Sequence, residues 1–192
     1  MSEVADRFVA VLDANVLYPF GIRDALLRFA EAGLYRARWS EDILAEWTGK
    51  LLKQKPHLGP SIESQLQAMQ RAFPEARVEG YQDLIESLGL PDKDDRHVLA
   101  AAIRSDAQVI VTENLRDFPT EALSPYEIEA RSADSFLAST FELYPQAAIA
   151  ALREMRRAYT APAMSPGEFI VYLNRQGLAQ LAAFAKEEID IL

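Results

Sequence analysis

The sequence has no cysteine and only two histidines among its 192 residues. The absence of cysteine excludes disulfide bonds and thiolate metal sites, and it is typical of a cytoplasmic protein. A histidine-rich zinc site is also a poor fit. No run of about 18 apolar residues occurs, so we expect no membrane span and no membrane partner. Residues 1–7 lack a basic segment, and we therefore expect no secretory signal there.

Positive charge is also scarce, because 20 Lys and Arg stand against 29 Asp and Glu, a formal net charge of −9. This balance argues against a surface that coats nucleic acid broadly, since counterion release needs clustered basic residues. It does not exclude an enzyme that meets a phosphodiester through a metal ion held by acids. The hydrophobic content of 49% is that of a globular protein with a sizeable core.

Strands and helices alternate along the first two thirds of the chain. Two apolar runs, Phe8–Leu12 and Gln108–Thr112, have the pattern of buried parallel strands, and shorter strands are predicted at 35–39 and 76–79. Helical spacing predicts helices between them, at 20–33, 40–55, 61–72, 82–88 and after Asp95. The alternation indicates an α/β fold with a mainly parallel central sheet.

Beyond about Ser132 the sequence predicts helices alone. The expected ranges are 136–144, 145–159, 165–174 and from 178 to near the last residue. We therefore predict an α/β domain over residues 6–130, followed by an all-helical C-terminal extension over residues 131–192.

Acidic residues recur at equivalent places in this architecture. Asp13 ends the first strand, Asp95 stands at the start of a helix, and Asp117 follows the second buried strand. The ends of parallel strands and the starts of the following helices meet at one edge of a sheet. Glu46, one turn into its helix, can point to the same edge. Asp13 in addition needs a partner for its buried charge, and a metal ion, a helix amide or an arginine would serve.

Four carboxylates in one pocket raise the pKa of one another, so a pocket holding Asp13, Glu46, Asp95 and Asp117 requires a cation. Oxygen ligands without thiols select Mg²⁺ or Mn²⁺. Such an ion can activate water and neutralise the charge of a phosphate.

The segments that carry these acids resemble the four motifs of PIN-domain ribonucleases, most closely those of VapC-type toxins. The segments are Val-Leu-Asp-Ala-Asn-Val-Leu-Tyr at 11–18, Ser-Glu-Asp-Ile-Leu-Ala-Glu-Trp at 40–47, Asp-Lys-Asp-Asp-Arg-His-Val-Leu-Ala-Ala-Ala at 92–102 and Val-Thr-Glu-Asn-Leu-Arg-Asp-Phe-Pro at 111–119. The resemblance covers about residues 6–130 and implies a three-layer α/β/α fold.

The resemblance also implies roles for individual residues. Asp13, Glu46 and Asp95 match the first three acids of the family, and Asp92 matches an accessory acid. Where the family often has another acid this chain has Asn114, so we assign the fourth role to Asp117 and a water-holding role to Asn114. By the same reasoning, Asn15 and Thr112 fix a carboxylate or a water by hydrogen bonds.

The implied activity is metal-dependent hydrolysis of RNA, with a small antitoxin protein as partner and a homodimer as a common assembly of the family. Basic residues that are candidates to hold the RNA backbone are Arg23, Arg36, Arg38, Lys50, Lys53 and Lys55.

Other interpretations of the same residues stay open. Asp95 can act as a helix N-cap, Glu46 can pair with Lys50, and His97 is expected as a surface or packing residue. The whole chain can instead be a catalytically weak PIN-fold binding module that acts through protein contacts. A phosphohydrolase of the haloacid dehalogenase type needs a second aspartate at position 15, where this chain has Asn15.

Overall fold

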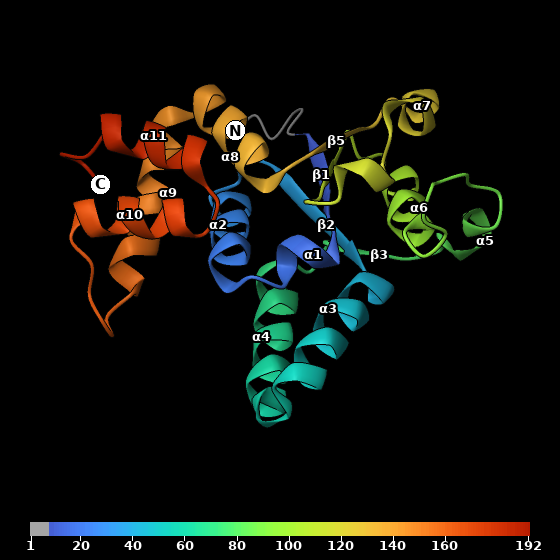
Figure 1. Ribbon diagram of the computed structural model, residues 1–192, viewed down its shortest axis with the longest axis horizontal. Coiled ribbons are helices and arrows are strands. Elements are labelled where there is room, and N and C mark those ends of the chain that lie inside the picture. The colour runs from blue at the N-terminus through green and yellow to red at the C-terminus, as the bar shows by residue number, and fades with distance from the viewer. Residues whose placement is uncertain (1–7) are drawn as a thin grey trace. The chain divides into compact units, whose positions relative to one another are not determined.

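The computed structural model describes residues 8–192 (Figure 1). The expectation about a secretory signal, and the first two residues of the predicted domain 6–130, lie outside this range. The described chain forms two compact units. The first contains residues 8–18 and 35–131, and the second contains residues 19–34 and 132–192. The second unit therefore resumes close to the predicted boundary at residue 130, and it also includes a segment from the N-terminal part of the chain.

The first unit is built on a five-stranded sheet in which every neighbouring pair of strands is parallel. The strand order is β3-β2-β1-β4-β5. The strands are β1 (Val9–Leu12), β2 (Arg36–Ser40), β3 (Arg77–Val78), β4 (Val109–Val111) and β5 (Glu129–Arg131). The predicted α/β class with a mainly parallel sheet is confirmed. Strand β5 was not predicted from the sequence, because its three residues, Glu-Ala-Arg, have no apolar pattern.

Strand β1 lies at the centre of the sheet because its apolar residues can be buried on both faces. Ala10 pairs with Ala37 of β2 on one side and with Val109 of β4 on the other. All four residues of β1 are buried. The chain direction of β1 therefore carries Asp13 to the carboxyl edge of the sheet, next to the end of β4.

The helices predicted between the later strands of the first unit are present, and the structure adds two short ones, Ala14–Leu17 and Thr120–Leu123, that the sequence analysis did not predict. The helices of this unit are α1 (Ala14–Leu17), α3 (Glu41–Gln54), α4 (Gly59–Ala72), α5 (Gln82–Ile85), α6 (Arg96–Arg104) and α7 (Thr120–Leu123). Short 3₁₀ helices are η1 (Pro56–Leu58), η2 (Leu115–Asp117) and η3 (Ser124–Tyr126). Helix α6 packs against β1, β2 and β4. Its run Val98–Ala102 is buried, and the three alanines allow the close approach.

Helix α3 begins at the predicted N-cap. The hydroxyl of Ser40 accepts a hydrogen bond from the backbone N–H of Ile43, at 3.2 Å. Ile43 and Trp47 lie one turn apart and are both fully buried. Because these two residues fix the buried face, the acidic residues Asp42 and Glu46 lie on exposed parts of the helix.

The second unit consists of helices. They are α2 (Phe20–Glu31), α8 (Ala133–Leu143), α9 (Pro145–Ala158), α10 (Pro166–Arg175) and α11 (Ala179–Glu187). The four predicted C-terminal helices are thus confirmed. Helix α2 packs against α8 and α9, while α11 packs against α8 and α10. Ser165 and Glu168 form the capping box that their spacing predicts.

Helix α2 ends where its sequence predicts. Gly33 adopts a φ of +70°, a left-handed conformation that favours glycine, and its N–H donates to the carbonyl oxygen of Ala30. Among residues 8–192, no helix has both the length and the apolar character needed to cross a bilayer.

Candidate active site

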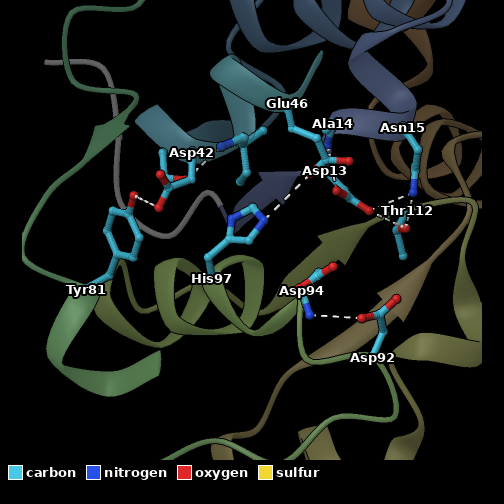
Figure 2. Close-up of polar contacts among 12 residues, drawn as sticks. Asp13, Ala14, Asn15, Asp42, Glu46, Tyr81, Asp92, Asp94, His97 and Thr112 are labelled. Atoms are coloured by element: carbon cyan, nitrogen blue, oxygen red, sulfur yellow. Dashed lines mark hydrogen bonds and ion pairs between the residues drawn. The ribbon is translucent and has the colours of Figure 1, made fainter. Parts of the chain in front are cut away.

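Asp13 lies at the carboxyl end of β1, where its carboxylate is held by three hydrogen bonds (Figure 2). One oxygen accepts from the backbone N–H of Ala14, at 2.6 Å, so that Asp13 caps helix α1. The other accepts from the amide of Asn15 and from the hydroxyl of Thr112, each at 2.7 Å. The side chain of Asp13 has therefore one fixed orientation at the sheet edge.

Thr112 and Asn15 also bind each other and the loop after β4. The Asn15 amide donates to the Thr112 hydroxyl at 2.9 Å, and its carbonyl oxygen accepts from the backbone N–H of Glu113 at 3.0 Å. The same hydroxyl accepts from the backbone N–H of Asn114 at 3.1 Å. This network joins the ends of β1 and β4. Asn15 and Thr112, which are 97 positions apart in the sequence, therefore donate to the same carboxylate oxygen of Asp13.

The pKa of Asp13 is raised, chiefly because the side chain is buried, with 2% of its surface exposed. The hydrogen bonds from Thr112 and Ala14 favour the carboxylate and oppose this rise. The charge of Glu46 adds to the rise, and His97 lowers the pKa. A buried carboxylate with only neutral donors is a group that a cation would stabilise.

Asp95 is the second acid of the cluster, at the position before the first residue of α6. It caps no backbone N–H with its side chain, so the helix-capping interpretation does not hold. Its pKa is raised to about 6. Burial is the largest cause, followed by the charges of the nearby acids Asp13, Asp92, Asp117 and Glu46.

The structure therefore brings three of the predicted acids, Asp13, Glu46 and Asp117, within electrostatic range of the fourth, Asp95. Asp117 lies in η2, half-buried. Asp92 is exposed, and its carboxylate accepts from the backbone N–H of Asp94 at 2.9 Å, in the loop before α6. The side chain of Asn114 is exposed.

Glu46 faces a residue that the sequence analysis assigned to the surface or the packing. Nε2 of His97 lies 3.7 Å from Oε2 of Glu46, as Figure 2 shows. The side chain of His97 is 15% exposed and that of Glu46 is 53% exposed. Glu46 therefore pairs across to α6, and the alternative pair with Lys50 along α3 is not formed.

The pKa of His97 is raised although burial of the ring favours the neutral form. The contact with Glu46 and the charges of Asp42, Glu46 and Asp13 favour the protonated ring and outweigh burial. Asp42 in turn accepts a hydrogen bond from the hydroxyl of Tyr81, at 2.6 Å. When its ring is protonated, His97 thus places a positive charge at the border of an acidic cluster.

Sequence reasoning missed His97, Asp42 and Tyr81 as parts of this region. The spacing of Asp42 and Glu46, four residues apart on a helix, was a usable signal that both lie on one face. His97 follows Asp95 by two residues at the start of the same helix, which was a second signal. Nothing local in the sequence indicates that Tyr81 reaches Asp42.

The donor set fits a hard divalent cation in its chemistry, since it consists of carboxylate, hydroxyl and amide oxygens. Burial and then the charges of the neighbouring acids raise the pKa of Asp95 at the same place. Within residues 8–192, no three acidic or histidine side chains converge closely enough to form a metal-binding group. These residues therefore have the ligand atoms and the negative charge that a divalent cation requires. Their carboxylates come from four different structural elements.

The basic residues proposed for the RNA backbone fall into different environments. Arg23 is 5% exposed and lies over the ring of Phe20 in the second unit. The prediction that Arg23 contacts RNA is wrong, because a buried guanidinium cannot meet a phosphate. Arg36 pairs with Glu75 at 3.6 Å, and Arg38 is half-buried. The lysines of α3 and its C-terminus are exposed.

Comparison with known proteins agrees with this architecture. The family model described as "PIN domain" matches residues 9–116, and the one described as "VapC50 C-terminal domain" matches residues 133–187. The chain is also 45% identical over 107 residues to the protein named "Putative ribonuclease VapC50" of Mycobacterium tuberculosis (strain ATCC 25618 / H37Rv). That similarity spans 56% of this chain and 62% of the relative's length. No solved structure matches.

The parallel sheet, the acids at its carboxyl edge and the match over more than half of the chain define one class. The chain belongs to the PIN-domain family. It combines this domain with a C-terminal helical segment like that of VapC50, which confirms the resemblance and the fold class predicted from the sequence.

Proposed function

We propose that the protein is a divalent-metal-dependent endoribonuclease that hydrolyses RNA phosphodiester bonds. The observation that carries the proposal is the acid cluster at the carboxyl edge of the sheet. Asp95 is influenced there by the charges of Asp13, Asp92, Asp117 and Glu46, and its pKa is about 6. Such a cluster is suited to a cation and to a reaction in which phosphate charge must be neutralised.

We assign the roles by the family resemblance, and the positions of Asp13 and Asp95 support the assignment. Asp13 and Asp95 would hold the principal ion, while Glu46 and Asp117 would orient water next to it. The ion, Mg²⁺ or Mn²⁺, would supply a water of lowered pKa and a positive charge beside the scissile phosphate. Asn15 and Thr112 hold the Asp13 carboxylate by hydrogen bonds, and His97 holds Glu46.

The choice of RNA as substrate is supported by similarity, since the relative from Mycobacterium tuberculosis is named a ribonuclease. The VapC name of the same relative supports the proposal that this chain is the toxin of a toxin–antitoxin pair. An antitoxin segment with positive charge would be attracted to the acid cluster. A homodimer stays a prediction from the family resemblance.

The deciding experiment is cleavage of a mixed RNA pool by the purified protein with Mg²⁺, with Mn²⁺ and with EDTA. The matched variants are Asp13→Ala, at the centre of the cluster, and Asp94→Ala, an exposed acid two residues from Asp92. We expect cleavage that requires metal, is lost in Asp13→Ala and persists in Asp94→Ala. Cleavage that persists in Asp13→Ala would refute the assigned site.

The second candidate is a binding module with weak or no catalysis. Two observations favour it: no three acidic or histidine side chains of the described chain converge into a metal-binding group, and Asn114 stands where the family often has an acid. Calorimetric titration with Mn²⁺ separates the candidates. Binding of Mn²⁺ that Asp13→Ala abolishes supports the nuclease, whereas absence of binding together with absence of cleavage supports the module.

A further inference from the structure

Helix α3 carries three exposed residues at intervals of four, Glu46, Lys50 and Gln54. Residues four apart share one face of a helix, about 6 Å from each other along its axis. Glu46 belongs to the acid cluster, so Lys50 stands one turn away from that cluster on the same face. Of the three lysines at positions 50, 53 and 55, Lys50 is the nearest to Glu46 along the helix, one turn away, while Lys53 lies on the same face two turns away.

The side chain of Tyr18 lies against this stripe. Nζ of Lys50 lies 5.5 Å from the centre of the Tyr18 ring, a cation–π contact, and the Tyr18 hydroxyl donates to Oε1 of Gln54 at 2.6 Å. These two contacts bring the ammonium group to one side of a half-buried ring. Lys50 is therefore more restricted in position than an ordinary surface lysine.

Tyr18 is itself tied to the acid cluster. It follows helix α1, whose N-cap is Asp13, and its backbone N–H donates to the carbonyl oxygen of Ala14 at 3.0 Å. Helix α1 packs against α3. Helix α1 leads from Asp13 to Tyr18, and helix α3 leads from Glu46 to Lys50. The contact between Tyr18 and Lys50 therefore lies on the C-terminal side of both acids.

The charge of Lys50 is available for a ligand. In the part of the chain that the structure describes, no ion pair involves Lys50. By contrast, Arg36, Arg77 and Arg131 all contact glutamates. Lys50 is thus a positioned cation one helical turn from the acid cluster, in a protein with a net charge of −9.

We infer that Lys50, positioned by Tyr18 and Gln54, binds a backbone phosphate of single-stranded RNA adjacent to the scissile phosphate. This inference rests on the proposed ribonuclease function and names a subsite for its substrate. Lys50 lies one helical turn from Glu46 of the acid cluster. If the acid cluster acts on the scissile phosphate, this separation suits a contact between Lys50 and a neighbouring phosphate. A lysine contact of this kind positions the strand and reads no base.

The alternative is that the Tyr18–Lys50 contact only fastens α1 to α3. The two roles differ in what they do to RNA binding. If the contact only stabilises the packing of α1 against α3, removing the Lys50 side chain should lower the melting temperature and leave the salt dependence of RNA affinity unchanged. A phosphate contact does the reverse, because each neutralised phosphate of a single strand contributes about 0.7 to the slope of log affinity against log salt.

The test measures binding of a fluorescently labelled single-stranded RNA oligonucleotide by anisotropy, in EDTA, at several salt concentrations. The variants are Lys50→Met and the matched control Lys186→Met, which removes the same charge at an exposed position of helix α11 in the second unit. For Lys50→Met we expect affinity to fall about threefold to tenfold at low salt, with a slope less steep by about 0.7. We expect Lys186→Met to bind nearly as the wild type does.

Two further measurements complete the test. In the cleavage reaction with metal, Lys50→Met should raise KM and change kcat little, as expected for a contact made before and during the reaction. Tyr18→Leu should reproduce part of the loss of affinity, with melting temperatures recorded for every variant. Arginine in Lys50→Arg should restore affinity, because it can also contact a phosphate.

Equal binding by Lys50→Met and Lys186→Met would overturn the inference, and so would a lower melting temperature of Lys50→Met with unchanged binding. Either result leaves the ribonuclease proposal intact, provided that the wild type cuts RNA and Asp13→Ala does not. A wild-type protein that neither binds nor cuts RNA would overturn both proposals, and the cleavage reaction of the wild type would already have revealed it.

Discussion

Nε2 of His97 on helix α6 lies 3.7 Å from Oε2 of Glu46 on helix α3, and this contact, an ion pair when the ring is protonated, connects two of the elements that carry acids of the candidate site. Both helices also contact each other. Glu46 is half exposed, and a free glutamate of that kind would sample many rotamers. The contact with His97 restricts it to the side of the helix that faces Asp13 (Figure 2).

The first prediction concerns this pair. His97→Ala should lower the rate of RNA cleavage about tenfold at neutral pH, because Glu46 loses the group that orients it. His97→Gln, which keeps a hydrogen-bond donor, should lose less. The measurement is the cleavage rate as a function of Mn²⁺ concentration, with melting temperatures recorded for both variants.

His57→Ala is the matched control, because His57 is exposed in η1 and is the other histidine of the chain. It should cut RNA at the wild-type rate. If His97→Ala has the rate and the metal dependence of the wild type, the ion pair has no part in orienting Glu46.

A second prediction concerns the folding stability of the metal-free protein. The pKa of Asp95 is about 6 in the folded state against an ordinary value of 3.8. Above pH 6 the charged side chain therefore destabilises the folded state, and the effect is relieved as the pH falls from 6 toward 4. Asp95→Asn should accordingly raise the free energy of unfolding at pH 7.5 by about 1–2 kcal/mol, a value reduced for solvent screening.

Urea unfolding in EDTA at pH 7.5 and at pH 4 measures this effect. We expect the difference between Asp95→Asn and the wild type to vanish at the lower pH. Asp94→Asn, an exposed neighbour, should change little. A variant Asp95→Asn that is less stable than the wild type at pH 7.5 would contradict the idea that the site stores repulsion for a cation.

Much of the fold was predictable because its signals are local. The apolar run before Asp13, the N-cap Ser40 and the capping box of Ser165 and Glu168 each specify an element within a few residues. The meeting of Asp13 and Asp95 at one edge follows from the rule that parallel strands end together. For these elements, the local sequence pattern and the topology of the parallel sheet predict the same arrangement.

The contacts that were not predictable join residues far apart in sequence. Tyr81 reaches Asp42 across 39 positions, and His97 reaches Glu46 across 51, a separation that no periodicity reveals. The three residues of β5 are recognisable as a strand only through their pairing with β4. Likewise, α2 has an ordinary amphipathic pattern that says nothing about its packing against α8 and α9.

A third prediction follows from that packing of α2. The hydroxyl of Tyr159, at the end of α9, donates to Oδ2 of Asp24 on α2 at 2.7 Å. We propose that residues 19–34 fold together with residues 132–192. Tyr159→Phe should then lower the free energy of unfolding by about 1–2 kcal/mol, because it removes a hydrogen bond to a charged acceptor.

Tyr126→Phe serves as the control, since Tyr126 is 42% exposed in the first unit. A chain that ends after Arg131 should show a larger loss, because α2 then has neither α8 nor α9 to cover its apolar residues. Thermal unfolding measures both. A truncated chain that melts at the temperature of the full chain would show that α2 needs no partner from the C-terminal helices.

The last prediction concerns the proton of Asp13. Thr112 is fully buried, and its hydroxyl donates to Asp13 at 2.7 Å, which lowers the pKa of that acid against the effect of burial. Thr112→Val keeps the shape of the side chain and removes the donor, so the pKa of Asp13 should rise further. Because only the carboxylate can hold a cation, the midpoint of the pH–rate profile should move to higher pH.

Thr112→Ser keeps the hydroxyl and should keep the midpoint of the wild type, which separates the proton effect from a loss of packing. The measurement is the cleavage rate from pH 5 to 9 at a Mn²⁺ concentration below saturation. Near pH 6 we expect Thr112→Val to be slower by about tenfold or more, with the deficit shrinking as the pH rises. A deficit that is the same at every pH would mean that Thr112 supports the fold and does not set the charge of Asp13.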